Sequence, residues 1–317
     1  MTAAEEAVAA LRCCAAIART PGRLAVPRAP DRAFLRGLAA ADVPPARRTV
    51  RVTAVPQARN SAPGVLAAEG RLRPLTVPML MATFVVRHPE AAFLVDPAVS
   101  ADVRTRFLAE MPLAMRAIVN PKGAVTGLRD GLAAAGTDPG EIAFAMATHA
   151  HWDHVCGLAE MPDLPLRLPS AEVAGVRSLP ERVRWGVFPD HLDSLPVETY
   201  DLDGPPVLTF TASHDVFGDG SVLVVPLPGH TPGSAGLLLA LEDDRRILLA
   251  GDAVWSRTQI GPVRQKAPMP GLMVDADRDE TFRTVHRLRA LPAEVEVVPS
   301  HDLAAIRAAG LLGQDTA

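Results

Sequence analysis

Short apolar runs, separated by polar residues, Gly or Pro, fill the chain between residues 50 and 150. Their length and their content of Val, Ile, Leu and Phe are typical of strands. The runs expected to form strands are 51–55, 79–86, 92–95 and 142–147. Two longer segments, 101–119 and 125–135, are expected to be helical, and Gly136 is the expected C-terminal end of the second. The pattern therefore predicts strands, then helices, then a further buried strand.

The second half of the chain repeats this pattern. The runs expected to form strands are 207–211, 221–227, 236–241, 246–250 and 295–298, and a helix is expected at 279–290. Two sheet-rich halves with helices between them predict an α/β fold in which two sheets form a sandwich covered by helices. The segment 161–206 is rich in Pro and Asp, so we expect a lid or a substrate-facing insertion there. Its aromatic residues are Trp185, Phe188, His191 and Tyr200.

The N-terminal segment 1–48 differs from the rest by its high content of Ala, Arg and Pro. Helices are expected at 3–18 and 32–41, with a stretch broken by Pro between them. We interpret 1–48 as a mostly helical extension and 49–317 as the catalytic domain. The extension can either pack on that domain or mediate the formation of a homodimer.

Composition and charge exclude several classes of protein. Hydrophobic residues make up 48% of the chain, and no apolar run approaches the ~20 residues of a membrane-spanning helix. The net charge of −4 does not favour nucleic acid as a partner. The three cysteines, Cys13, Cys14 and Cys156, do not predict a disulfide framework, and the N-terminus lacks the features of a secretory signal. We therefore expect a cytoplasmic protein without a membrane or nucleic-acid partner.

The predicted strand 142–147 leads directly into His149-Ala150-His151-Trp152-Asp153-His154. Three of the 9 histidines of the chain lie within these six residues, which weighs against a chance cluster. Neutral imidazoles and carboxylates are the ligands that zinc takes in proteins. A strand that ends in a tight turn can direct several of these side chains to one point. The hexapeptide therefore predicts a metal site.

Three further candidate ligands also follow apolar runs. His230 stands in the turn Gly229-His230-Thr231-Pro232-Gly233, Asp252 follows Gly251, and His301 lies between Ser300 and Asp302. Each signal is weak by itself, because a polar residue after a strand is commonly part of an ordinary turn. If the strands end at one edge of the sandwich, all three side chains join the hexapeptide.

The order of these motifs resembles that of the metallo-β-lactamase-fold hydrolases over roughly residues 50–302. The resemblance implies an αββα sandwich and two divalent metal ions, with zinc expected first and manganese, iron or cobalt as alternatives. It implies that His149, His151 and His230 hold one ion, that Asp153, His154 and His301 hold the other, and that Asp252 bridges them. Two such ions can hold a hydroxide that attacks an ester carbonyl, while Asp153 takes part in proton transfer to the leaving group.

Asp252 distinguishes between branches of this family. The β-lactamases of this fold are similar up to this point but carry Cys or Ser there, so lactam hydrolysis is not expected. Three local features resemble the lactonase and phosphotriesterase-like branch: 216–221, 275–279 and 300–302. A small-molecule lactone or related ester is therefore the expected substrate. Phosphotriester or thioester hydrolysis, a metal-binding protein without catalysis, and oxidation of a sulfur substrate by one iron remain the alternatives.

One departure from the lactonase pattern concerns the substrate pocket. Related homoserine lactonases often carry a tyrosine three residues after the bridging Asp, and this chain has Trp255 there. An indole N–H donates one hydrogen bond but cannot act as an acid. The residues expected to line the pocket are Trp255, Phe188, His191 and Trp152.

Overall fold

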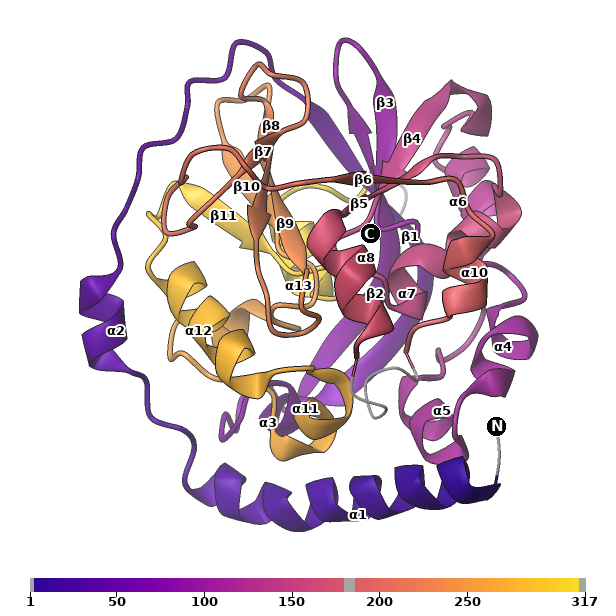
Figure 1. Ribbon diagram of the computed structural model, residues 1–317, viewed down its shortest axis with the longest axis vertical. Coiled ribbons are helices and arrows are strands. Elements are labelled where there is room, and N and C mark those ends of the chain that lie inside the picture. Colours follow the sequence, from indigo (N-terminus) through magenta and orange to yellow (C-terminus); the bar gives the residue numbers. More distant parts are fainter. Residues whose placement is uncertain (1–2, 180–185, 314–317) are drawn as a thin grey trace.

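Two β-sheets that face each other form the centre of the computed structural model, which describes residues 3–179 and 186–313 (Figure 1). The first sheet has six strands in the order of their numbering: β1 (Arg51–Pro63), β2 (Thr76–Arg87), β3 (Ala92–Val95), β4 (Ile142–Met146), β5 (Leu166–Pro169) and β6 (Val197–Tyr200). Strands β1, β2 and β3 pair in antiparallel fashion, and β3 to β6 pair in parallel. The parallel strands require helical crossovers, which the helices between them supply.

The second sheet has five strands in the order β11-β10-β9-β8-β7. They are β7 (His214–Asp215), β8 (Val222–Pro226), β9 (Ala235–Ala240), β10 (Arg246–Leu249) and β11 (Val295–Val298). Only the β10–β11 pair is parallel among the pairs of this sheet, and the helix α12 (Arg278–Arg289) lies between these two strands in the chain.

The alternation of side chains along the strands creates a core between the sheets and one on each outer face. On β2, Phe84 and Val86 lie in the central cluster, whereas Val85 belongs to the cluster outside the first sheet. On β9, Leu237 lies in the central cluster and Leu238 lies outside the second sheet. Strands with both faces buried explain why these runs are apolar without interruption.

Helices cover the outer faces of both sheets. Those that contribute to the cluster outside the first sheet are α6 (Leu128–Ala134), α7 (Trp152–Val155), α8 (Ser170–Arg177) and α10 (Pro189–Asp193). Helix α12 covers the second sheet with Phe282, Val285 and Leu288. Helix α13 (Leu303–Ala308) packs at the end of the central core. The layers are helix, sheet, sheet and helix, which confirms the predicted αββα sandwich.

Helix α1 (Ala3–Ala25) of the N-terminal segment lies across α5 (Leu113–Val119) and α11 (Pro268–Val274), as Figure 1 shows. The prediction that this helix ends at residue 18 is wrong, because it continues through Pro21. Contacts with α5 and α11 through Ala16, Met115 and Met273 hold the helix where its own hydrogen bonding is interrupted. None of the described helices combines the length and the hydropathy that a bilayer span requires.

The remaining elements are short. The helices are α2 (Arg32–Gly37), α3 (Gly64–Ala67) and α4 (Val103–Arg106), and the 3-10 turns are η1 (Leu108–Glu110), η2 (Pro139–Glu141), η3 (Cys156–Glu160) and η4 (Arg257–Gln259). The segment 101–119 is thus divided into α4, η1 and α5 and is not one helix.

Two predictions for the middle of the chain are wrong. In its described parts, 161–179 and 186–206, the segment supplies β5, β6, α8 and α10 to the sandwich and is not a separate insertion; Trp185 lies outside the described residues. The run 207–211 forms a tight turn, in which Leu208 has a φ of 53°, and packs under α12. An apolar run indicates burial, and a buried turn has the same composition as a buried strand.

Candidate metal centre and adjoining cavity

The loops that follow four strands meet at one edge of the sandwich. The hexapeptide follows β4, the turn with His230 follows β8, Asp252 follows β10, and His301 follows β11. Gly251 makes the approach to Asp252 possible, because its φ is +54° and a Cβ there would lie 2.7 Å from the hydroxyl of Thr148. All seven candidate ligands are therefore brought together as the sequence predicts.

Three imidazole nitrogens converge in the first half of the cluster. His149 Nε2 lies 3.1 Å from His151 Nδ1, which lies 2.9 Å from His230 Nε2. The carboxylate of Asp275, 2.9 Å from His230 Nδ1, requires the proton on that nitrogen, so Nε2 presents its lone pair to the centre. Donors around a zinc ion are roughly 3.3 Å apart, so this spacing is close to that of a metal site.

The second half of the cluster contains Asp153, His154 and His301. His301 Nε2 lies 3.2 Å from Asp153 Oδ2 and 3.2 Å from Asp252 Oδ1, while His154 Nε2 lies 3.5 Å from Asp252 Oδ1. The backbone carbonyl of Leu80, 2.8 Å from His301 Nδ1, places the proton on the outer nitrogen of that ring. The inner nitrogens of both rings therefore point toward the carboxylates.

Asp252 lies between the two halves. Its Oδ1 faces His154 and His301, and its Oδ2 lies 3.5 Å from His230 Nε2. Trp255 donates its indole N–H to the same Oδ2 at 2.8 Å. One carboxylate thus presents one oxygen to each half, which is the arrangement that a bridging ligand requires.

Burial and neighbouring charges give the two halves different proton affinities. Burial, with the neighbouring histidines, lowers the pKa of His149 well below its usual range and that of His151 to about 3. Burial also lowers the pKa of His154, but the carboxylates of Asp96 and Asp153 outweigh it and raise that pKa to about 10. The pKa of His301 is raised for the same kind of reason. The first half therefore presents neutral donors, and the second half exchanges protons when a cation binds.

The donor set fits divalent metal ions. His149, His151 and His230 form one group whose ligand atoms lie within 4.8 Å of one another, and Asp153, His154 and His301 form another. His154 Nε2 and Asp252 Oδ1 are buried without a hydrogen-bond partner. Buried polar atoms are rarely left unpaired, so these orphan atoms favour a bound cation between them. His149, His154 and Asp252 form a third such group, so the division into two triads and the number and identity of the ions stay predictions.

Asp96 supports the hexapeptide from the end of β3. Its carboxylate accepts hydrogen bonds from the Thr148 backbone N–H at 2.7 Å and the Ser300 hydroxyl at 2.9 Å, and it lies 2.9 Å from His154 Nδ1. The chain thus uses one buried carboxylate to orient a candidate ligand and two ligand-bearing loops.

Sequence reasoning missed two supporting residues, Lys266 and Glu172. The Lys266 ammonium is fully buried and donates to Asp275 Oδ1 at 2.8 Å and to the backbone carbonyl of Asp252 at 2.9 Å. The buried Glu172 carboxylate accepts from the Ala150 N–H at 2.8 Å and from the Thr231 hydroxyl at 2.7 Å. The low lysine content gives a signal for Lys266, since 30 of the 32 basic residues are arginines.

A cavity of about 250 Å³ opens beside the cluster, and Asp153, Asp252 and His301 line its floor. Trp255 lines it, as predicted. Its other walls are formed by Asn60, Ser61, Ala62, Pro63, Leu66, Met79, Met81, Ile118, Val119, Met269 and Pro270. Met79 and Met81 stand at the start of the run 79–86, and an apolar run predicts a strand without showing that one end of it borders a cavity.

The other three residues expected in the pocket lie elsewhere in the described structure. Trp152 is buried in a cluster with Phe107 and Cys156. Phe188 and His191 line a different cavity, together with Phe107. His191 Nε2 lies 3.3 Å from the backbone carbonyl of Val155, the residue that follows the hexapeptide. None of the three lines the cavity beside the candidate ligands, and their assignment to the substrate pocket stays a prediction.

Known proteins share this sequence pattern and this fold. Residues 81–301 match the family model of the Metallo-beta-lactamase superfamily. The N-acyl homoserine lactonase AttM of Rhizobium radiobacter is 28% identical to this chain over 178 residues. The aligned residues are 56% of this chain and 64% of that protein, so the match covers less than two thirds of the relative's length. The AttM lactonase of Rhizobium johnstonii is 25% identical over 228 residues, 70% of this chain and 81% of that protein.

A solved structure of an N-acyl homoserine lactone hydrolase, with N-hexanoyl-L-homoserine bound at its catalytic metal centre, shares the fold with a TM-score of 0.61. Its identity is 16%, and the match covers 82% of this chain and 96% of that one. The fold and the histidine and aspartate cluster are those of a metal-dependent hydrolase. Because the family model matches more than half of the chain and includes all seven candidate ligands, the chain belongs to the metallo-beta-lactamase superfamily.

Proposed function

We propose that the protein hydrolyses lactones or related carboxylic esters that carry an apolar group, with two divalent metal ions held by the two triads and Asp252. The observation that carries this proposal is the cavity of about 250 Å³ in which Asp153, Asp252 and His301 face a largely apolar wall. A site with a few converging polar groups and otherwise apolar walls is typical of a pocket for a small molecule.

The apolar walls favour a substrate with an acyl or alkyl chain. Leu66, Met79, Met81, Ile118 and Val119 come from three separate segments and surround the space next to the carboxylates. Burial of apolar surface contributes about 0.8 kcal/mol per CH₂ group. A substrate therefore gains affinity with each methylene that the wall covers, while its ester group stays at the polar floor.

The metal ions, when bound, would polarise the ester carbonyl and lower the pKa of a water molecule. In this proposal Asp252 presents one oxygen to each triad, and the Trp255 N–H fixes the orientation of that carboxylate. Asp153 lines the cavity, so its carboxylate can transfer a proton to the alkoxide that leaves when the ring opens. A substrate that covers the apolar walls of the cavity would limit the access of bulk water to the reacting group.

The names of the relatives support the lactone as the substrate class. The two AttM proteins described above are named N-acyl homoserine lactonases. Trp255 is the local difference to consider, since its donor is already bound to Asp252. We therefore propose a lactone with an apolar chain and do not transfer the relatives' pocket residue by residue.

The experiment is a substrate panel with the zinc-loaded protein. N-acyl homoserine lactones of increasing chain length are compared with an aryl ester, a thioester and an aryl dialkyl phosphate, and metal content is measured by mass spectrometry. We expect about two equivalents of metal and a kcat/KM for lactones that rises up to about fourfold per CH₂. His151→Ala should lose metal and activity, whereas His214→Ala on the edge strand β7 should keep both.

Two results would contradict the proposal. One is a protein that holds about two equivalents of metal and cleaves the thioester or the phosphate but not the lactones. The other is lactone hydrolysis that persists unchanged in His151→Ala. Fewer than one equivalent of metal in folded, active protein would overturn the two-ion part alone.

A further inference from the structure

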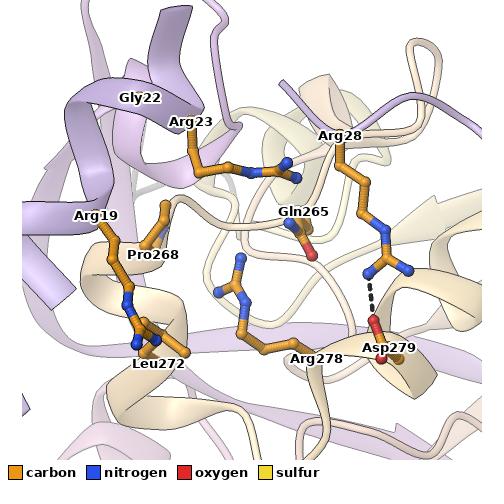
Figure 2. A pocket seen from close by; sticks show the side chains of 9 residues that line it. All are labelled: Arg19, Gly22, Arg23, Arg28, Gln265, Pro268, Leu272, Arg278 and Asp279. Atoms are coloured by element: carbon orange, nitrogen blue, oxygen red, sulfur yellow. Dashed lines mark hydrogen bonds and ion pairs between the residues drawn. The ribbon is translucent and has the colours of Figure 1, made fainter. Parts of the chain in front are cut away.

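A second cavity, of about 530 Å³, lies between α1 and the segment that contains α11 and the start of α12. Four of its nine lining residues are arginines: Arg19, Arg23, Arg28 and Arg278. Figure 2 shows that the guanidinium groups of Arg23 and Arg278 point toward the middle of this cavity from opposite walls. The arginines come from the N-terminal segment and from α12, so the two parts of the chain build the cavity together.

Carboxylates compensate only some of these arginines. Arg28 forms an ion pair with Asp279 at 2.5 Å, and Arg23 forms one with the buried Glu69 at 3.1 Å. Arg19 has no ion pair or hydrogen bond with any described residue. The cavity therefore keeps free guanidinium donors.

Arg278 is the most enclosed of the four, since its side chain is 16% exposed. It donates to the backbone carbonyls of Lys266 at 2.8 Å and Ala267 at 3.3 Å, and its nearest carboxylates, Glu69 and Asp275, lie 3.9 Å away. Burial lowers the pKa of Arg278 more than Asp275 and Glu69 raise it, and the nearby Arg23 and Arg28 lower it further. A bound anion would offset both the burial and the repulsion.

We propose that this cavity binds the phosphate group of a small phosphorylated molecule. Guanidinium groups bind phosphate in bidentate fashion, and a phosphate monoester has three free oxygens for donors that arrive from different walls. A carboxylate has one negative charge and two oxygens in one plane, so it satisfies fewer guanidinium donors that arrive from different walls than a phosphate does. The cavity has the size of a ligand pocket, and Pro268 and Leu272 supply an apolar wall for the rest of the molecule.

This site is separate from the proposed active site. Gln265 and Pro268 line the arginine cavity, whereas Met269 and Pro270 line the cavity beside the metal centre. The segment 265–270 therefore separates the two spaces. Phosphate binding here does not require lactone hydrolysis, so either proposal can fail without the other.

The experiment is calorimetric titration of the zinc-loaded, full-length protein with inorganic phosphate, with adenosine monophosphate and with acetate at constant ionic strength. The variants are Arg19→Glu, which reverses an exposed and unpaired charge, and Arg23→Lys, which keeps the charge next to Glu69 but removes the planar fork. Arg307→Glu on α13 is the matched control, since this exposed arginine does not line the cavity.

We expect saturable binding of inorganic phosphate or adenosine monophosphate, weakened about tenfold or more by Arg19→Glu and by Arg23→Lys and unchanged by Arg307→Glu. Tighter binding of adenosine monophosphate supports an organic phosphate as the ligand, and equal binding supports recognition of the phosphate group alone. Equal affinity for acetate would overturn the phosphate class. Binding that neither cavity variant weakens would place the anion elsewhere, including at the metal ions, and would overturn the site.

Discussion

Lys266→Met tests the buried ion pair behind the candidate metal centre. The Lys266 ammonium lies 2.8 Å from Asp275 Oδ1, and both side chains are fully buried. Asp275 in turn holds His230 Nδ1 at 2.9 Å. Burial and the Lys266 charge together lower the pKa of His230. Methionine preserves most of the side-chain volume but removes the charge and the hydrogen bonds to Asp275 and to the backbone carbonyl of Asp252, so the variant tests the ammonium group without a large change in packing.

The structure gives the expected magnitude. Removing one partner of a buried ion pair costs about 3–5 kcal/mol. Arg278 Nη1 remains 3.9 Å from Asp275 Oδ2, so we expect the lower end, about 3 kcal/mol. With an unfolding entropy of about 2.1 cal/mol/K per residue over 317 residues, this loss lowers Tm by roughly 4–5 °C. Without the Lys266 charge the pKa of His230 rises, so protons compete with metal at a higher pH and zinc affinity at pH 7 falls about 10- to 100-fold.

Scanning calorimetry of the metal-free protein measures the first effect, and zinc titration measures the second. Lys122→Met is the matched control, since Lys122 is the other lysine of the chain and is exposed. A surface substitution changes stability by at most about 0.5 kcal/mol, so its Tm should move by less than about 1 °C. If Lys266→Met unfolds at the same temperature as Lys122→Met and binds zinc equally well, the assigned role of the ion pair is refuted.

Three further predictions concern the metal centre and its supports. Trp255→Phe removes the indole N–H that donates to Asp252, and it should lower kcat/KM for a lactone about 10- to 100-fold at unchanged zinc content. An unchanged kcat/KM would show that this hydrogen bond does not position the carboxylate of Asp252. Asp96→Asn should reduce bound zinc from about two equivalents to about one, because the ring of His154 loses its carboxylate partner, and retention of both after dialysis would contradict this. The raised pKa values of His154 and His301 mean that both carry protons at neutral pH without metal. Zinc should therefore displace protons, and the affinity for zinc should fall as the pH falls from 9 to 7. Calorimetric titrations in buffers of different ionisation enthalpy measure the number of released protons. Zinc binding without proton release would show that the inner nitrogens are already neutral.

The candidate ligands could be predicted because each stands immediately after an apolar run. Asp252 follows β10 and His301 follows β11, and these strands are neighbours, so their ends lie at one edge of the sheet. The position of each of these strands follows from its continuous apolar run and from the turn residues that bound it. Local sequence therefore contains the information for both the strand and the ligand at its end.

Other features depend on contacts between distant segments. Glu172 lies on α8, and nothing in its local sequence shows that its carboxylate meets Ala150 and Thr231. The acidic segment 275–279 could be recognised as a motif, but its residues act separately. Asp275 holds His230, Asp277 caps α12, and Asp279 pairs with Arg28. Each role is decided by what packs against the residue, which the pattern of neighbouring residues does not contain.

The segment 265–270 shows how one short stretch serves three surroundings. Lys266 points to Asp275 and to the backbone of Asp252, while Gln265 borders the arginine cavity and Met269 borders the cavity beside the metal centre. An ammonium is compact and can be enclosed between two acceptors, whereas a guanidinium has five donors in a plane that need partners. This difference explains why a chain so rich in arginine has lysine at this position. Lys266 contacts both the backbone of Asp252 and the carboxylate of Asp275, which holds His230. A displacement of the segment 265–270 would therefore change the positions of candidate ligands in both halves of the metal centre.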